Sequence, residues 1–487
     1  MADLLGVGKS GLFAAKKSLE VTGHNMSNVN TEGYSRQKVL QSTAIPLVKG
    51  GLSQGNGVKV DSISRVNDDF INKRLNTSYS SSKFYESRSE QLDQIESIYN
   101  EIDSEGLNQI LNKFFNSFRE LANQPENETI RSVVRDNAIL VTKDFRRIRD
   151  TLDFQAKSID RKITNSVTDV NQILDHISEL NEKISVIEVQ GAETGDLRDQ
   201  RDLALKNLSE YFKIDTYSDE KGHFVVMAQG IGTIVTGVNT LKFGVVTKEK
   251  NSSSNNMNGS VEIVLKDRPS QSITNNFQSG SISGIVKIRN DELKKLQEDM
   301  DNIAFKFANS VNQVHRAGFV NREIKTHDDG TPYLSDDKGP TTGINFFKNL
   351  STSEYASGEI QLSDEVMENL SNISTAASPN SVGDNKIAIA ISMLQNEKIA
   401  GENTSTLEEQ FLQIIGNIGL ETGKARIDAE QSHAIFAQTN AIRERLTGVS
   451  IDEETSNMIR YQHAYEASAK MIQTADEMFK TVLDLKR

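Results

Sequence analysis

The longest periodic stretch of the chain runs from Leu107 to Gln190, where no glycine occurs and Pro125 is the only proline. Its apolar residues recur at steps of three and four, the spacing of one face of an α-helix. This pattern predicts a single helix that starts near Thr129 and is longer than about fifty residues. At 1.5 Å per residue it would span about 80 Å, too long for an ordinary globular core and typical of a rod-like bundle. The apolar positions are Phe145, Ile148, Leu152, Ile159, Ile163, Val167, Val170, Leu174, Ile177, Leu180, Ile184 and Ile187.

A heptad pattern marks both ends of the chain, and the last helix is expected from Ile451 to the C-terminus. Ser450 and Glu453 have the spacing of a capping box at its start. The two terminal helices are either unrelated parts of one globular core or a coiled-coil pair, and we favour the pair. The N-terminal assembly seam comprises Leu5, Gly8, Leu12, Ala15, Leu19, Thr22, Met26 and Val29; the C-terminal assembly seam comprises Met458, Tyr461, Tyr465, Ser468, Ile472, Ala475, Phe479 and Val482.

The stretch Gly6–Ser10, within "ADLLGVGKSG", looks like a phosphate-binding loop and suggests, as a remote alternative, a nucleotide-binding enzyme. Such a loop needs a glycine where this chain has Asp3, and it must follow a buried strand. The glycines are better explained as seam positions without a side chain, which allow a partner helix to pack closely. Because each interior glycine costs a helix about 1 kcal/mol relative to alanine, we predict that the N-terminal segment is disordered in the free monomer. It would become helical when neighbouring subunits cover its seam.

Strand signals collect in the middle of the chain, where β-branched runs and turn residues alternate from Ile214 onward. A helix is expected over 290–316, a mixed region over 317–400 and a long helical hairpin over 404–446. The predicted fold class is mainly α with a central β portion (α+β), an elongated multidomain rod. We expect a terminal coiled-coil domain (1–65 and 447–487), a long helical bundle (66–212, 289–318 and 401–446), β-hairpins packed on the bundle (213–288) and a reduced outer mixed insertion (319–400).

The amino-acid composition excludes several classes of partner and binding site. The 487 residues carry a formal charge of −13, which disfavours nucleic acid as a partner, and they include no cysteine, which excludes disulfides and thiolate metal sites. No apolar run reaches the roughly 18–20 residues of a membrane span. No signal-peptide pattern occurs at the N-terminus, which by itself favours the cytoplasm.

Three other stretches and the seven histidines contain residue types found in functional sites. "GSISG" (280–284) has Ile282 where a nucleophile elbow needs serine, and "HDDGTPY" (327–333) lacks the ligand spacing of a calcium loop, so that a plain turn is favoured. The seven histidines form no metal-binding pair; His433 and His463 are expected on helix surfaces or interfaces. The charge cluster "DLRDQRD" is either a solvated helix face, the favoured interpretation, or a brace between bundle and β region through Asp199, Arg201 and Asp202. We therefore expect no enzyme activity, cofactor or metal.

The segment "GHNMSNVNTEGYSRQ" resembles the N-terminal signature of bacterial flagellar axial proteins, and its Tyr-Ser-Arg-Gln continuation is similar to the hook-associated protein 1 family of hook–filament junction proteins. Glu32 departs from the proline common at that position in the family. Residues 195–212, 280–319 and 448–485 resemble further segments of the same family, in order along the chain. The axial-protein turn that carries the signature comprises Asn28, Asn30, Thr31, Gly33, Tyr34, Ser35, Arg36 and Gln37.

This resemblance implies a structural subunit that forms the junction ring between hook and filament. Its implied partners are further copies of itself, the hook protein below, a second junction protein (hook-associated protein 3) above and an export chaperone, with no nucleic acid, membrane or small-molecule substrate. It also implies export through the flagellar type III apparatus and an extracellular location in the flagellum, which revises the cytoplasmic expectation. The alternatives are a flagellin-like or other axial subunit and an adhesin that binds through its β region.

Overall fold

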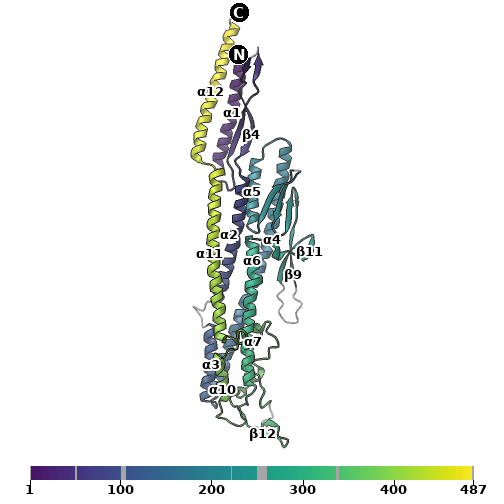
Figure 1. Cartoon of the computed structure of the whole chain (residues 1–487), viewed down its shortest axis with the longest axis vertical. Helices are drawn as coiled ribbons and strands as arrows, with labels where there is room; N and C mark the ends of the chain where they lie inside the picture. Colours follow the sequence, from purple (N-terminus) through teal and green to yellow (C-terminus); the bar gives the residue numbers. More distant parts are fainter. Residues whose placement is uncertain are drawn as a thin grey trace.

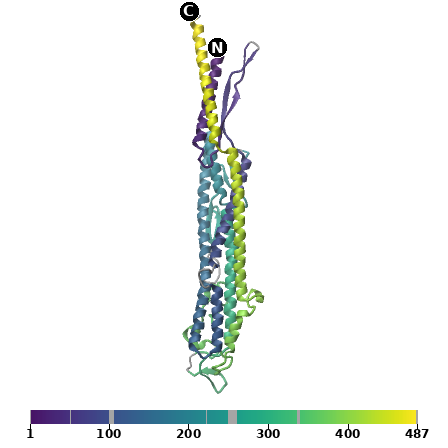
Figure 2. The ribbon, with the colours of Figure 1, turned by 90° about the vertical axis from the view of Figure 1, so that its left-hand side faces the viewer.

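The computed structural model describes residues 2–49, 52–99, 106–220, 222–248, 260–335 and 339–484. The chain forms a long rod with both termini at one end (Figures 1 and 2). The predicted class, mainly α with a central β portion, is confirmed. A pair of terminal helices extends from a body whose helices are aligned with the long axis of the rod, and small antiparallel sheets flank that body.

Long helices run along the body of the rod. The predicted long helix is confirmed as α4 (Glu128–Val189), with 62 residues. The predicted hairpin over 404–446 is wrong, because α11 (Leu407–Thr447) is a single helix of 41 residues that starts with a capping box at Thr406 and Glu409. The return helix consists of α6 (Gly280–Lys287), the π-helical turn η2 (Ile288–Leu293) and α7 (Lys294–His315).

Helix α2 (Asp69–Tyr99) has no clear apolar stripe, so its periodicity did not predict it. Much of its buried face consists of serines. These small side chains allow α6 to come close: a Cβ on Gly284 would collide with the Ser87 hydroxyl. The buried serines of α2 are Ser78, Ser80, Ser82, Ser87 and Ser89.

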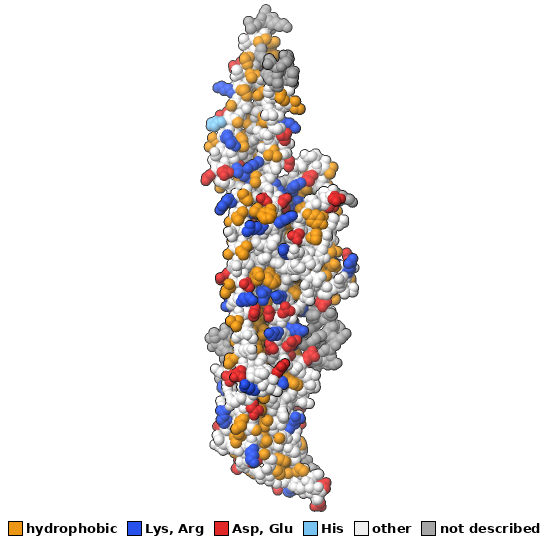
Figure 3. Space-filling view, viewed as in Figure 1, with side chains coloured by type: hydrophobic (Ala, Val, Ile, Leu, Met, Phe, Trp, Pro, Cys, Tyr) orange, Lys and Arg blue, Asp and Glu red, His pale blue; other side chains and the backbone are white. Residues whose placement is uncertain are grey.

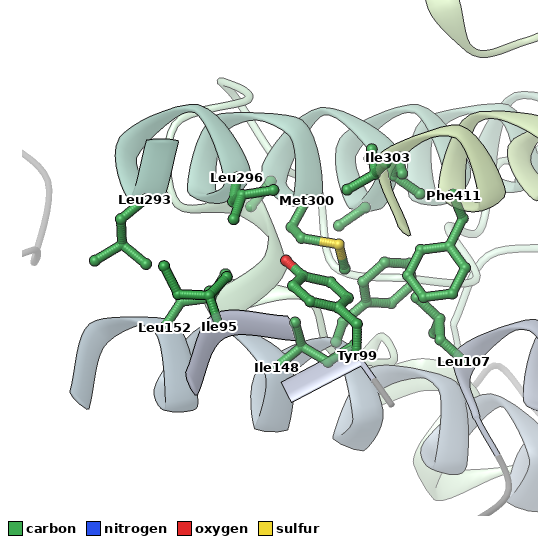
Figure 4. Packing of buried hydrophobic residues seen from close by; sticks show 14 of the residues in the cluster. Ile95, Tyr99, Leu107, Ile148, Leu152, Leu293, Leu296, Met300, Ile303 and Phe411 are labelled. Carbon is green, nitrogen blue, oxygen red and sulfur yellow. The ribbon is translucent and has the colours of Figure 1, made fainter. Parts of the chain in front are cut away.

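The core of the rod lies between these helices (Figure 4). Ile95 and Tyr99 of α2 point toward Met300 of α7, with Ile148 of α4 beneath them. Phe411, near the start of α11, lies beside Tyr99, with ring centroids 6.3 Å apart. One continuous buried cluster therefore joins segments that are more than three hundred residues apart in sequence, from Leu92 to Ala425.

The lower end of the rod holds α3 (Leu107–Asn123), α10 (Lys386–Met393) and the short elements between α7 and α11. Phe346 and Phe347, from the region expected as an outer insertion, are fully buried against Phe114 and Phe307. Part of this region thus completes the core. The short elements between α7 and α11 are β12 (Ile324–Thr326), β13 (Pro332–Leu334), α8 (Ala356–Glu359), α9 (Asp364–Glu368), η3 (Leu370–Asn372), η4 (Leu394–Asn396) and η5 (Gly401–Asn403).

Two small antiparallel sheets pack beside α4, after α5 (Gly195–Ser209). The first has the order β5-β6-β7-β8 and the second the order β11-β10-β9. The strands are β5 (Ile214–Ser218), β6 (Phe224–Ala228), β7 (Gly232–Thr236), β8 (Asn239–Thr240), β9 (Phe243–Lys248), β10 (Ser260–Leu265) and β11 (Arg268–Ser272), followed by η1 (Thr274–Asn276).

The terminal part consists of α1 (Ala2–Ser27), α12 (Ile451–Asp484) and a hairpin. In the hairpin, β1 (Gln37–Thr43) pairs antiparallel with β4 (Val58–Arg65), and β2 (Leu47–Lys49) pairs with β3 (Leu52–Gln54). These strands were not predicted from the hydrophobic pattern. Helices α1 and α12 lie side by side and run in opposite directions, so the predicted pairing of the chain ends is confirmed (Figures 1 and 2).

Candidate assembly site: the terminal helix pair and its joint with the rod

Glycines bring α1 and α12 close together. A Cβ on Gly8 would lie 3.0 Å from Ile472 Cγ1, and one on Gly11 would lie 2.9 Å from the Ser468 hydroxyl. A larger residue at either position would push the helices apart. Helix α1 is continuous through Gly6–Ser10, so this stretch forms a helix and not a phosphate-binding loop.

The helix pair buries the small residues of the two seams and leaves the large ones half-buried or exposed. Gly8, Ala15, Thr22, Ser468 and Ala475 are buried. Those half-buried are Leu12, Leu19, Met26, Val29, Met458, Tyr461 and Ile472; those exposed are Leu5, Tyr465, Phe479 and Val482. The contact within one chain therefore covers only part of each seam.

Further apolar side chains of the pair face solvent, and Figure 3 shows hydrophobic side chains along this end of the molecule. The seam pattern did not include them, although Met471 and Met478 widen its stripe. A groove of about 540 Å³ lies between the two helices, lined by Leu4, Met471 and Ala467 among others. The additional exposed residues are Leu4, Phe13, Ile451, Ile459, Met471, Met478 and Leu483.

Asn25 organises the turn that follows α1. Its side-chain oxygen accepts hydrogen bonds from the Tyr34 hydroxyl (2.8 Å) and the Gln37 amide (2.9 Å). Its side-chain nitrogen donates to the Gln37 carbonyl (2.9 Å) and to Glu454 of α12 (3.1 Å). The heptad pattern does not include Asn25; the signal in the sequence is a polar amide in the last turn of the amphipathic helix.

Arg36 ties the turn to the start of α12. Its guanidinium donates to Glu454 (2.8 Å) and to Glu453 (2.7 Å), and its backbone amide donates to the Thr447 carbonyl (2.8 Å). Glu454 is 2% exposed, and its carboxylate accepts hydrogen bonds from Arg36, from Asn25 and, at 3.4 Å, from Asn457. We name the cluster of Asn25, Tyr34, Arg36, Asp199 and Glu454 the terminal joint.

Asp199 of α5 anchors the terminal joint to the rod. It accepts a hydrogen bond from the Ser35 amide (2.8 Å) and from Arg65 (2.8 Å), which also contacts Asp202 (2.7 Å). Burial raises the pKa of Asp199 despite these partners. Burial opposes the charge of Arg65, but Asp202 and Asp199 outweigh it and raise the pKa of that guanidinium. Burial likewise raises the pKa of Tyr34, which is therefore a neutral donor.

The charge cluster "DLRDQRD" is a brace rather than the solvated face that we favoured. Arg201 lies 3.7 Å above the ring centroid of Phe224 in β6 and donates to Asn181 of α4 (3.1 Å). Burial lowers the pKa of Arg201 to about 10. Since Asp199 and Asp202 hold Arg65 at the base of the hairpin, α5 links the terminal part, the bundle and the sheet.

The remaining turn residues shape the backbone. Gly33 has φ +82°, a conformation that strains other residues, and a Cβ there would lie in tight contact with Leu203 Cβ (3.2 Å), so glycine is favoured at this position. Thr31 donates to Asn28 through its amide (3.0 Å) and its hydroxyl (3.2 Å), whereas Asn30 is exposed. Gln37 donates to Asp196 of α5 (2.6 Å).

The remaining candidate residues of the sequence lie in ordinary turns and helices in the part of the chain that the structure describes. Over the described ranges there is no group of His, Asp and Glu suited to a metal ion, and no helix long and apolar enough to cross a membrane. The segment 327–333 is the β12–β13 turn, where Asp329 accepts from the Thr331 amide (2.9 Å). His433 and His463 are exposed on helices.

Comparisons with known proteins agree with this architecture. Residues 92–327 match the family model "Flagellar hook-associated protein FlgK helical domain", and residues 446–485 match "Flagellar basal body rod FlgEFG protein C-terminal". The flagellar hook-associated protein 1 of Bacillus subtilis is 29% identical, over 99% of this chain and 97% of its own length. That of Salmonella typhimurium is 23% identical over 100% of both chains.

Among solved structures, the flagellar hook junction protein FlgK from Burkholderia pseudomallei shares the fold, with a TM-score of 0.63 at 14% identity, over 78% of this chain and 100% of that one. Paired terminal helices on a helical rod and these matches define a structural protein of the bacterial flagellar axis. Within that class, the chain is similar over nearly its whole length to flagellar hook-associated protein 1, and these matches support a structural subunit of the hook–filament junction.

Proposed function

We propose that copies of this chain form a ring in which the terminal helix pairs line the inside of the tube and the rod bodies form its wall. The observation that carries this proposal is the incomplete burial of the helix pair: Leu5, Phe479 and Val482 face solvent in the single chain. Apolar surface of this kind gains free energy when neighbours cover it. The two seams and the axial-protein turn are the residues that we assign to assembly.

The location and partners follow from this role. The subunit leaves the cytoplasm through the flagellar type III apparatus with the help of a chaperone and acts outside the cell. It contacts the hook protein on one side and the second junction protein on the other. It works mechanically, as an adaptor between two subunit packings, and needs no catalytic residue, cofactor or metal.

We further infer that the helix pair is weakly ordered in the free chain. Interior glycines at 8, 11 and 23 weaken α1, and few large side chains are buried between α1 and α12. Amide exchange on a verified monomer tests this: residues 5–29 should exchange much faster than α4. Strong protection of residues 5–29 would contradict it.

Electron microscopy of cells that lack this protein tests the function. We expect hooks without filaments and flagellin shed into the medium, with filaments restored by the intact gene. Normal filaments in the deletion strain would refute the junction role. Polymerisation of the purified chain into long filaments, instead of stopping at a ring, would favour a flagellin-like subunit.

A further inference from the structure

Helix α11 carries glycines that nothing in the single chain requires. At Gly416 and Gly423 an added Cβ would meet no atom within 4 Å. Glycine inside a helix is unfavourable relative to alanine. In the terminal pair, by contrast, Gly8 is explained by Ile472, 3.0 Å from the position of its missing Cβ. The glycines of α11 therefore point to a close neighbour that the single chain does not contain.

The same side of α11 exposes large apolar residues. Leu420 is 75% exposed and Ile427, one heptad later, is 66% exposed. The opposite side of the helix packs on α2 through Phe411, Ile418 and Ala425, also at heptad spacing. We name the side that bears Gly416, Leu420, Gly423 and Ile427 the outward face of α11. Because Gly416 and Gly423 have no side chains, they leave a hollow in this face, and the apolar side chains of Leu420 and Ile427 lie beside it.

A second apolar stripe lies on α4. Val133, Leu140 and Phe154 are exposed at steps of seven and fourteen residues, and Phe154 is 62% exposed. They form the outward face of α4. Figure 2 shows α4 and α11 on opposite sides of the rod, and α2 and α7 contact both helices. The two faces therefore cannot meet within one chain, but they can meet between adjacent copies in a ring.

Charge distinguishes the two faces. Around the α4 stripe, the cations Lys143, Lys157 and Arg161 are exposed beside the carboxylates Asp136 and Asp150, whereas Arg147 is held by Asp144 (2.7 Å). Around the α11 stripe, the carboxylates Glu409, Glu421 and Glu430 are exposed. Arg426 of α11 is held by Asp93 (2.8 Å) and Glu96 (2.9 Å) of α2, which leaves Lys424 as the cation on this face. Opposite net charges favour pairing of the α4 face with the α11 face over pairing of either face with itself.

We propose that the outward face of α11 packs against the outward face of α4 of a neighbouring copy, with an α4 side chain such as Phe154 seated in the hollow at Gly416 and Gly423. This contact is heterologous, since it joins two different faces of neighbouring copies side by side. It rests on the proposed ring and adds a second set of subunit contacts, along the rods. It lies away from the terminal helix pair. Because the flanking charges are exposed, high salt should weaken the contact.

Disulfide trapping tests the contact cleanly, since the chain contains no cysteine of its own. Leu420→Cys is combined in turn with Val133→Cys, Leu140→Cys or Phe154→Cys, and flagella purified from cells that carry each full-length variant are mildly oxidised. At least one combination should give a ladder of multimers on a denaturing gel, because a heterologous contact links every subunit to the next. Leu420→Cys combined with Val238→Cys, on the β7–β8 turn, should stay monomeric.

Two results would overturn the inference: no ladder from any combination although the chain is present in the flagella, or dimers from Leu420→Cys alone, which would mean that α11 pairs with itself. Absence of the unmodified chain from purified flagella would instead refute the proposed function.

Substitution of a glycine in the hollow gives an independent test, read from the melting temperature and from incorporation into flagella. Gly423→Leu should raise the melting temperature of the free chain, because leucine favours a helix, while lowering incorporation into flagella at least tenfold. The matched control is Gly419→Ala on the same helix, whose Cβ would lie 3.8 Å from Glu96 of α2. The control should also raise the melting temperature but leave incorporation unchanged. Wild-type incorporation of Gly423→Leu would overturn the proposal.

Discussion

The body of the rod and the terminal helix pair bury different kinds of side chain. In the body, Phe114, Phe145 and Phe307 are fully buried, and the helices pack around large apolar groups. In the terminal pair, the buried positions are small, such as Gly8 and Ala475, whereas large apolar residues remain open. The body thus draws its stability from its own core, whereas the helix pair would gain further burial from neighbours in the proposed ring. In that proposal, one chain combines a part that folds alone with a part completed by assembly.

The largest effect on the stability of the free chain is expected in the body. Phe307→Ala removes a ring that contacts Phe114, Phe115, Phe145 and Phe347. It should lower the free energy of unfolding by about 3–5 kcal/mol. Urea denaturation measures this change. Phe13→Ala in α1, at a side chain that is 52% exposed, is the matched control and should change it by less than about 0.5 kcal/mol. Equal losses from both variants would contradict the contrast between the two regions.

The body also contains a pH-sensitive residue, His315. Its Nδ1 lies 2.8 Å from the Ile344 carbonyl, and its Nε2 accepts from the Ser374 amide (2.9 Å), which requires the neutral ring. Burial lowers its pKa to about 4 from 6.5. The unfolded chain therefore takes up the proton first, so stability is complete above pH 6.5 and falls by about 3 kcal/mol as the pH drops toward 4.

Denaturation curves of the wild type and of His315→Gln at several pH values measure this effect. The stability difference between the two proteins should shrink as the pH falls from 6.5 to 4, since the substitution removes only the histidine contribution. Buried carboxylates such as Asp199 are common to both proteins and cancel. A difference that does not vary with pH would show that His315 is not the sensitive group.

A smaller and local effect is expected at the terminal joint. Arg36→Ala removes the cation beside the buried carboxylate of Glu454, which should weaken the docking of α12 by about 2 kcal/mol. Amide exchange should accelerate over the first turns of α12, with α4 unchanged. The exposed Arg460→Ala, on the same helix, serves as the control. If both variants exchange alike, Arg36 does not hold the joint.

The smallest effect on the free chain, and the largest on assembly, is expected from the seams. Leu12→Asp or Ile472→Asp should change the free energy of unfolding by less than about 1 kcal/mol, because both side chains are only half-buried. In the ring each would bury an unpaired charge, so filament formation should stop. Gln473→Asp, at an exposed neighbouring position, should leave filaments intact. Filaments built by Leu12→Asp would show that the seam residues were wrongly assigned.

Much of the fold followed from residue patterns. The length of α4 was predictable because its apolar residues repeat without interruption over many turns. The pairing of the chain ends was also predictable, since both carry heptad seams. Helix α2 was not, because its buried face is largely serine, and burial of serine depends on the partner helix and not on hydrophobicity.

At the terminal joint, the sequence by itself determined that Gly33 must turn the chain and that a polar segment follows α1. Only the tertiary structure decided that Asn25, Arg36, Asp199 and Glu454 meet, because hydrogen bonds between residues 164 to 429 positions apart leave no periodic pattern in the sequence. The same holds for "DLRDQRD": its charges suggested a solvated face, but Asp199 and Arg201 are buried. Apolar spacing is a local property that the sequence contains in full, whereas the burial of a charge depends on partners that only the folded chain brings within hydrogen-bonding distance.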